Sequence, residues 1–301
     1  MDNNAKIFTS SKNFHLAGIV PIAGQAFDFN MDWHDSLFPI SPDYTLLDNA
    51  IVECAWAGCD TIWVICHADT IPLVRHRVGD YINDPVWANR AKDVNPSQSM
   101  KRIPIFWCPI HPKDKDKRDC LSWSVIYGAL QSLKVSTQLS KWIIPDKYYV
   151  SFPYGVFDPE QLRPHRKKIS SPKNFYVLNQ GKTAQDNHYT SFTFGKDEFI
   201  RFRRQVRKGT GMYTSTLDED GIPRERLPVE DRWSARFFEL KDIFIDLDIN
   251  SGNKLNLEEF YNVASWNQYR EYLKSPLANK LRRPTAKIFK YSEFNKIGND
   301  R

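Results

Sequence analysis

The chain has 301 residues, of which 41% are hydrophobic, and nine Trp, thirteen Tyr and nineteen Phe add bulky core-forming side chains. This content suffices to bury a sizeable core, which excludes a globally disordered chain. The formal net charge is +6, but the basic clusters at residues 113–118, 163–173 and 201–208 lack aromatic RNA-binding motifs, so we expect solvated faces and no nucleic-acid partner.

Neither a membrane helix nor an export signal is expected. No stretch approaches the roughly 18 uninterrupted apolar residues that a membrane span needs, and the first residues do not combine a basic segment with an apolar run. The five cysteines lie mostly in apolar segments, which predicts reduced, buried thiols: Cys54, Cys59, Cys66, Cys108 and Cys120. We therefore expect a cytoplasmic protein with no disulfide and no metal site.

The first expected strand is the apolar run HLAGIVPI at residues 15–22, which ends in an Ala-Gly turn. A helix with one apolar face follows from Thr45, with Asp43 as its predicted N-cap and Gly58 at its end. The next run, TIWVIC at residues 61–66, has no polar alternation, as expected of a parallel strand covered on both faces. Together these segments form a β-α-β unit.

The alternation of strands and helices continues along the chain. Three further helices are predicted. The first covers residues 71–81. The second follows Asp119, which we expect to be its N-cap, and the third covers residues 262–273, with Ser265 as its predicted cap. Further apolar runs predict strands at residues 102–108, 147–152 and 174–178.

Strands that alternate with helices of about 10 to 15 residues predict an α/β fold with a mostly parallel central sheet and helices on both faces. We expect a single domain over residues 1–301, in which residues 1–180 are regular and residues 181–301 are irregular. Ligands of such sheets bind at the carboxyl ends of the strands. The loop at residues 23–40, after the first strand, is therefore the first candidate binding region.

Several pieces of the chain, in order, resemble the sugar-phosphate nucleotidyltransferase family, whose Rossmann-like fold is of the glycosyltransferase-A type. IAGQAFD at residues 22–28 stands where the family has Ala-Ala-Gly-x-Gly-x-Arg, and LFPI at residues 37–40 is similar to the end of its Pro-Lys-Pro-Leu-Leu-Pro-Ile motif. KYYVSFPYGVFDPEQL at residues 147–162 resembles the strand that ends in the family's Gly-Asp. NVASWNQYREYL at residues 262–273 resembles its Asp-Ile-Asp-Thr helix start. The resemblance implies that residues 1–180 are a nucleotide-binding half.

The resemblance also implies which side chains line the site. In the family, glycines and backbone amides hold a triphosphate, Arg and Lys neutralise its charge, and two Asp bind magnesium. Asp28 replaces the Arg and Asp35 replaces the Lys, while Tyr154 and Asn262 stand in place of the two Asp. Each negative charge beside a triphosphate would repel it by about 1 kcal/mol. The implied binding residues are Ala23, Gly24, Gln25, Asp28, Asp35, Tyr154 and Asn262.

An active enzyme would need substitutes for these four lost groups. Lys147, Lys113 or Arg118 would have to supply positive charge, and Asp158 or Asp32 would have to bind magnesium.

A second motif, DINSGNKLNLEE at residues 248–259, resembles a calcium-binding loop at its first, third and last positions. Gly252 lacks a side-chain oxygen at the fifth position, and Asn253 stands where the motif has Gly. We therefore predict an ordinary polar turn.

The loop after the first strand offers two further readings. Trp33-His34-Asp35 places an acid beside a base, but adjacent side chains often point apart, which favours a surface or capping role. The aromatic residues of the same loop are alternatively typical of a protein contact: Phe27, Phe29, Trp33 and Phe38.

These observations lead to three hypotheses. The first is a nucleotidyltransferase-like protein with a degenerate site that works without a cofactor by binding a nucleotide, a sugar phosphate or a protein partner. The second is an active, magnesium-dependent enzyme that transfers a nucleotidyl group to a sugar phosphate. The third is a structural or assembly protein, which would bind protein partners or form a homo-oligomer. This hypothesis follows from a resemblance of the chain to proteins of T4-like marine phages, and it implies a location in the host cytoplasm or the virion.

Overall fold

The computed structural model describes residues 14–24, 31, 33–90, 101–115, 118–139, 144–209, 220–222, 225–229, 232 and 237–284. Its centre is an eight-stranded sheet in the order β11-β9-β10-β7-β1-β4-β6-β5. The strands are β1 (Leu16–Pro21), β4 (Thr61–Cys66), β5 (Tyr81–Asn83), β6 (Arg102–Pro109), β7 (Lys147–Val150), β9 (Phe175–Asn179), β10 (Phe192–Phe194) and β11 (Asn253–Leu257).

The sheet is mostly parallel, as predicted. Strand β1 lies between β4 and β7 and is parallel to both, with Ala17 opposite Thr61 and Leu16 opposite Lys147. Within the sheet as the structure describes it, β5 and β10 run opposite to their neighbours. Every residue of β1 and β4 is buried, which explains why both sequences are apolar without alternation.

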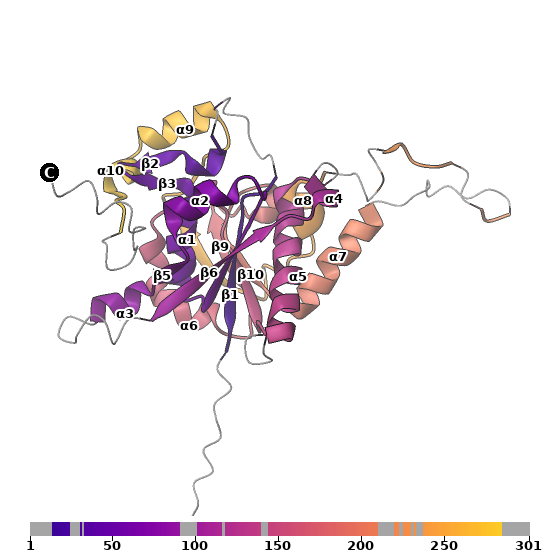
Figure 1. The fold of residues 1–301 in the computed structure, drawn as a ribbon, viewed down its shortest axis with the longest axis horizontal. Coiled ribbons are helices and arrows are strands. Elements are labelled where there is room, and N and C mark those ends of the chain that lie inside the picture. Colours follow the sequence, from indigo (N-terminus) through magenta and orange to yellow (C-terminus); the bar gives the residue numbers. More distant parts are fainter. Residues whose placement is uncertain are drawn as a thin grey trace, which may run out of the picture.

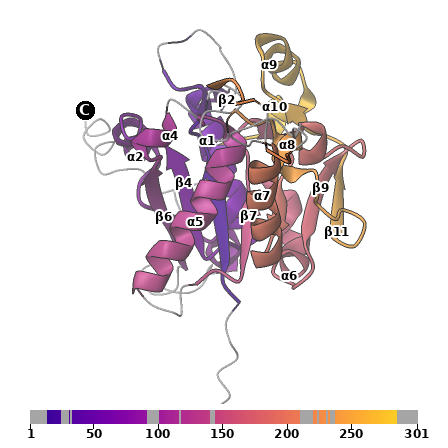
Figure 2. The same ribbon diagram turned by 90° about the vertical axis from the view of Figure 1, so that its right-hand side faces the viewer.

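Helices cover both faces of the sheet, which confirms the predicted architecture. Helices α5 and α7 lie side by side on one face (Figure 2), and α1 lies on the other (Figure 1). The helices are α1 (Leu46–Ala57), α2 (Ile71–Val78), α3 (Pro85–Arg90), α4 (Pro112–Lys115), α5 (Leu121–Leu139), α6 (Arg166–Ile169), α7 (Lys196–Gly209), α8 (Leu240–Phe244), α9 (Trp266–Leu273) and α10 (Pro276–Lys280). No helix in the described part of the chain is long and apolar enough to cross a membrane.

Helix α1 begins two residues later than an N-cap at Asp43 would require. Thr45 is its N-cap: the Thr45 hydroxyl accepts the backbone N–H of Asp48, and the Asp48 carboxylate accepts that of Thr45, at 3.2 and 3.1 Å. The prediction of Asp43 as the cap was therefore wrong, because a reciprocal capping box satisfies two free N–H groups at once. The predicted end is confirmed, since Gly58 closes the helix at a φ of +91°.

Two other predicted helix boundaries can be compared with the structure. Helix α2 ends at Val78, not at Tyr81, because Gly79 adopts a φ of +91° and Tyr81 begins the edge strand β5. Ser265 caps α9 as predicted, since its hydroxyl accepts the backbone N–H of Gln268. Residues after 180 add β10 and β11 to the same sheet.

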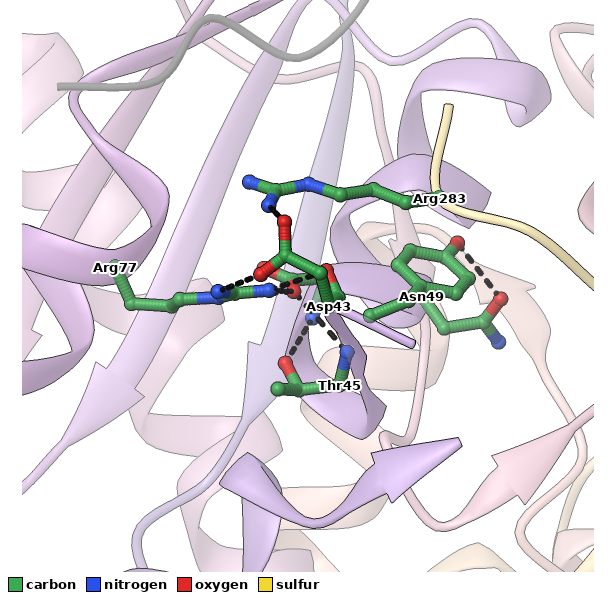
Figure 3. A network of polar contacts seen from close by, with 7 residues as sticks. Asp43, Thr45, Asn49, Arg77 and Arg283 are labelled. Atoms are coloured by element: carbon green, nitrogen blue, oxygen red, sulfur yellow. Dashed lines mark hydrogen bonds and ion pairs between the residues drawn. The ribbon is translucent and has the colours of Figure 1, made fainter. Parts of the chain in front are cut away.

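The C-terminal described segment is fastened to the N-terminal half by ion pairs. Figure 3 shows the guanidinium groups of Arg77 and Arg283 reaching Asp43 from two sides. Arg77 also contacts the fully buried Asp48 carboxylate, at 2.7 Å. Nearby, the Ser41 hydroxyl, in strand β2 (Pro39–Ser41), donates to the backbone carbonyl of Leu281. These contacts hold α9 and α10 beside β2 and β3 (Tyr44–Thr45) (Figure 1).

Candidate functional site

The carboxyl ends of β1, β4 and β7 meet at one edge of the sheet, as their parallel directions require. The chain leaves β1 through Ile22 and Ala23, whose backbone N–H groups both donate to the carbonyl of Ile65, at 2.9 and 2.8 Å. The Ser124 hydroxyl on α5 donates to the carbonyl of Ala23, at 2.7 Å. The start of the loop is therefore fixed between β4 and α5.

Gly24 brings this loop against the amino end of α5. Its φ is +108°, and a Cβ atom at this position would lie 2.6 Å from the backbone carbonyl carbon of Cys120. Both the conformation and the space require glycine. Cys120 directly precedes α5, a helix of 19 residues, whose amino end carries a partial positive charge.

A contact between a histidine and a carboxylate lies next to this packing of Gly24. The Nε2 atom of His67, which follows β4, is 2.9 Å from the Oδ2 atom of Asp119, and both side chains are mostly buried. The second carboxylate oxygen of Asp119 is buried and has no hydrogen-bond partner among the described residues. His34 lies within electrostatic range of the same side chains: burial lowers its pKa, and His67, Asp119 and Asp69 also act on it.

His34 does not pair with its neighbour Asp35. Its Nδ1 atom accepts the backbone N–H of Ser36, at 3.2 Å, and lies 2.8 Å from the Ser36 hydroxyl. His34 thereby caps the short 3-10 helix η1 (Asp35–Leu37). The capping interpretation of Trp33-His34-Asp35 is confirmed.

Asp35 and Tyr154, both predicted from the resemblance, are close enough to interact. The Tyr154 side chain is 1% exposed. Its pKa is raised far above the ordinary value, first by burial and then by the charge of Asp35. The Tyr154 ring also packs edge-on against the ring of Tyr189, with centroids 5.9 Å apart. Position 154 is therefore a neutral, buried phenol.

Asn262 joins the same group from the far end of the chain. It lies in β12 (Tyr261–Asn262), which pairs with β8 (Gly155–Val156). The side-chain oxygen of Asn262 accepts the backbone N–H of Tyr189, at 3.1 Å, and its Nδ2 atom is 3.3 Å from Nδ1 of His188. The next residue, Val263, donates its N–H to the carbonyl of Tyr154. The amide of Asn262 thus has protein partners at both ends.

A cavity of about 240 Å³ opens beside Tyr189. It lies between the amino ends of α5 and α8 and the segment that precedes β10. Its polar groups include the Ser122 hydroxyl, which donates to the carbonyl of Phe238, and the Asn187 amide, which donates to Glu239 at 2.8 Å. The lining residues are Cys120, Leu121, Ser122, Asn187, Tyr189, Phe238, Glu239 and Leu240.

A fully buried carboxylate lies within the fold at the same end of the sheet. Glu53 of α1 accepts hydrogen bonds from the hydroxyls of Tyr149, at 2.7 Å, and Ser151, at 2.8 Å, and from Ser191. Burial raises the pKa of Glu53 to about 7. The three hydroxyls compensate for only part of the lost hydration. The sequence analysis did not predict this buried carboxylate, although a Glu among the apolar positions of a helix is a signal for one.

Three of the proposed substitutes for the lost groups, Lys147, Arg118 and Asp158, are engaged in other contacts. Lys147 lies at the amino end of β7, away from the candidate site, and its ammonium donates to three backbone carbonyls, among them that of Ser171 at 2.9 Å. Arg118 pairs with Asp114, at 2.6 Å, and stacks over Trp123. Asp158 caps the 3-10 helix η3 (Pro159–His165) and pairs with Lys280. Lys113 lies exposed in α4.

Some predicted residues fall outside the described residues, namely Gln25, Asp28 and Asp32 of the loop. Across the described ranges, no group of three His, Cys, Asp or Glu side chains is arranged to hold a metal ion. In the calcium-loop motif, Asp248 instead accepts the backbone N–H of Ser251. Residues 249–251 form a turn, as predicted, but the prediction was wrong for Asn253–Leu257, which form strand β11.

Comparisons with known proteins identify the fold. No protein-family model matches the chain, and no curated protein sequence matches it. Among solved structures, a protein assigned as a glucose-1-phosphate thymidylyltransferase from Bacillus anthracis, in complex with a sucrose, is similar with a TM-score of 0.54 at 8% identity, covering 90% of this chain and 98% of that one.

Two structures from Acinetobacter baumannii are similar at a TM-score of 0.50. They are a UTP-bound UGPase, at 10% identity, and a UDP-glucose pyrophosphorylase, at 9% identity; each comparison covers 89% of this chain and 97% of the other. The chain therefore has the α/β fold of the sugar-phosphate nucleotidyltransferases, as the resemblance implied. At these identities the likeness establishes the fold alone.

Proposed function

We propose that this protein binds a nucleotide sugar or a sugar phosphate at the carboxyl edge of its sheet and does not catalyse magnesium-dependent nucleotidyl transfer. The observation that carries this proposal is the meeting of Tyr154 and Asn262. The two positions lie far apart in the sequence yet contact the same residue, Tyr189. Neither side chain carries a negative charge.

These two side chains do not fit a magnesium ion. Magnesium takes oxygen ligands in an octahedral arrangement and usually binds through one or two carboxylates. The phenol of Tyr154 stays protonated, because burial raises its pKa. The oxygen of Asn262 already accepts the N–H of Tyr189. Asp35 beside Tyr154 is a single carboxylate, and it replaces a positive charge of the family.

The arrangement nonetheless offers groups that suit a sugar phosphate. Gly24 allows a close approach of backbone to the amino end of α5, where N–H groups and the helix dipole favour a phosphate. The cavity beside Tyr189 is lined by the Ser122 hydroxyl and the Asn187 amide, which keep hydrogen-bonding capacity beyond their bonds to Phe238 and Glu239 and suit a neutral ligand. The similar solved structures include one bound to UTP and one in complex with a sucrose, which supports nucleotide and sugar ligands for this fold.

Electrostatics favours ligands of low charge. Behind burial, the charge of Asp35 acts on the pKa of Tyr154, and the charges of Asp119 and Asp69 act on the pKa of His34, so three carboxylates lie within electrostatic range of the site. Each unit charge near a polyanion costs on the order of 1 kcal/mol in a well-solvated site. A nucleoside triphosphate carries more negative charge than a nucleotide sugar. We therefore expect the nucleotide sugar to bind more tightly.

A thermal-shift series tests the proposal, because a ligand that binds only the native state raises the melting temperature. The protein is melted with UDP-glucose, dTDP-glucose, glucose 1-phosphate, UTP and dTTP, each in magnesium and in EDTA. A nucleotide sugar or the sugar phosphate should raise the melting temperature equally in both. In a separate assay, magnesium-dependent release of pyrophosphate from a mixture of UTP or dTTP with glucose 1-phosphate would instead establish the active enzyme. A flat thermal-shift series would favour a role in protein assembly.

A further inference from the structure

Two half-exposed tryptophans stand at the rim of the candidate site. Trp33 lies in the loop after β1 and exposes 48% of its surface, and Trp266 begins α9 and exposes 42%. Large aromatic side chains are normally buried, so an exposed pair is informative. Residues that are far apart in the sequence thus present two indole rings on one side of the molecule.

Both rings rest on the same buried aromatic residue. The Phe38 ring lies 6.5 Å from Trp33 and 5.5 Å from Trp266, measured between centroids, and is only 3% exposed. Tyr269 packs edge-on against both Phe38 and Trp266, and its hydroxyl donates to the carbonyl of Pro39 at 2.6 Å. The indole rings are therefore supported from behind, which lowers the entropy lost when a ligand stacks on them.

The tryptophans adjoin the residues of the candidate site along the chain. Trp33 directly precedes His34 and Asp35, and Asp35 interacts with Tyr154. Trp266 follows Asn262 by one short connection. Figure 1 shows α9 beside β2 and β3, at the end of the molecule toward which β1 points. A ligand at the carboxyl edge of the sheet can thus reach the two rings.

The exposed area decides between kinds of ligand. A tryptophan side chain presents roughly 250 Å² at most, so the two exposed fractions together offer on the order of 200 Å². A standard protein interface needs about 800 Å² on each partner. An area of this size instead matches a flat ring of a small ligand. Every nucleobase has such a ring and can stack on an aromatic side chain.

We propose that Trp33 and Trp266 form the stacking platform for the nucleobase of a nucleotide ligand. This inference rests on the proposed function and assigns the base to the rim of the site. The base carries no charge at neutral pH, so the nearby carboxylates do not repel it. The phosphate and sugar then extend toward Gly24 and the cavity.

The test compares a ligand that has a base with one that lacks it. Dissociation constants for UDP-glucose and glucose 1-phosphate are measured by calorimetry for the unmodified protein, Trp33→Leu and Trp266→Leu. Leucine keeps an apolar side chain but removes the aromatic face. Stacking of one base is worth about 1 to 3 kcal/mol, so each variant should bind UDP-glucose about 5- to 150-fold more weakly. Its affinity for glucose 1-phosphate should not change.

Trp87→Leu is the matched control, because Trp87 is 49% exposed but belongs to α3; it should leave both affinities unchanged. Circular dichroism and the melting temperature establish that each variant is folded. Trp33→Phe and Trp266→Phe retain a smaller aromatic ring and should restore part of the affinity for UDP-glucose. Unchanged UDP-glucose affinity in both leucine variants would overturn the platform while leaving the proposed function intact. If the unmodified protein bound glucose 1-phosphate but not UDP-glucose, the stacking proposal would be overturned and the proposed function would stand. Binding of neither compound would overturn both.

Discussion

The side-chain oxygen of Asn262 accepts the backbone N–H of Tyr189 at 3.1 Å. This bond joins the short β8–β12 pair to the segment that leads into β10, and it places Tyr189 against the ring of Tyr154. An amide at position 262 therefore has a structural role within the candidate site.

We predict that the stability of the protein depends on an acceptor oxygen at position 262. Asn262→Ala leaves the N–H of Tyr189 without its acceptor and should lower the free energy of unfolding by about 1 to 3 kcal/mol. Asn262→Asp keeps an acceptor oxygen and should cost less. Urea denaturation of both variants measures the difference. Equal losses in the two variants would show that the hydrogen bond contributes nothing.

Gly24→Ala should destabilise the protein by about 3 kcal/mol or more. The new Cβ would meet the backbone of Cys120 at 2.6 Å, and alanine is strained at a φ of +108°. Gly181→Ala is the control: φ is +78°, but no atom lies within 4 Å of the added Cβ. It should cost only the backbone strain, about 1 kcal/mol. Equal midpoints of chemical denaturation would contradict the close packing of Gly24 on α5.

Two arginines of helix α2 should differ sharply in their contribution to stability. Arg77→Ala removes the cation that faces the fully buried Asp48, and an uncompensated buried charge costs about 3 to 5 kcal/mol. Arg75 pairs with Asp80 in a half-exposed position, where solvent screens the interaction, so Arg75→Ala should have little effect. Thermal and urea unfolding of both variants provide the comparison. A larger loss for Arg75→Ala would be inconsistent with the network in Figure 3.

Glu53 should make stability depend on pH. Burial raises its pKa from 4.5 to about 7 in the folded protein, so the folded state holds a proton that the unfolded state releases between these pH values. Stability contributed by this group is therefore full below pH 4.5 and falls as the pH rises to about 7. The loss is about 3 kcal/mol.

Glu53→Gln lacks the titrating group and should not show this part of the pH dependence. The difference in unfolding free energy between the two proteins should shift in favour of the glutamine variant as the pH rises through the same range. Parallel curves for the two proteins would show that Glu53 titrates normally.

The predicted strands agree with the structure where burial on both faces dictates the residues. Residues 16–22 and 62–66 are uniformly apolar because β1 and β4 lie at the centre of the sheet. Strand β10 was not predicted: it has three residues, and composition does not reveal that it runs antiparallel between β7 and β9. Such a strand is specified by its neighbours more than by its own sequence.

The candidate site could be predicted only where the resemblance aligned it. It brought together Tyr154 and Asn262, which the structure places around Tyr189. The pair of His67 and Asp119 was missed, because it depends on which loops meet at the carboxyl edge. A histidine directly after a buried strand is the signal that would have identified half of this pair.

The most direct test of the central claim is a calorimetric titration of the protein with UDP-glucose, dTDP-glucose and glucose 1-phosphate, in EDTA and then in excess magnesium. We expect saturable binding of at least one of these compounds, with the same dissociation constant in both buffers, because Tyr154 and Asn262 offer magnesium no carboxylate. Binding that appears only with magnesium, or no binding of any of the three, would contradict a metal-independent nucleotide-sugar or sugar-phosphate site.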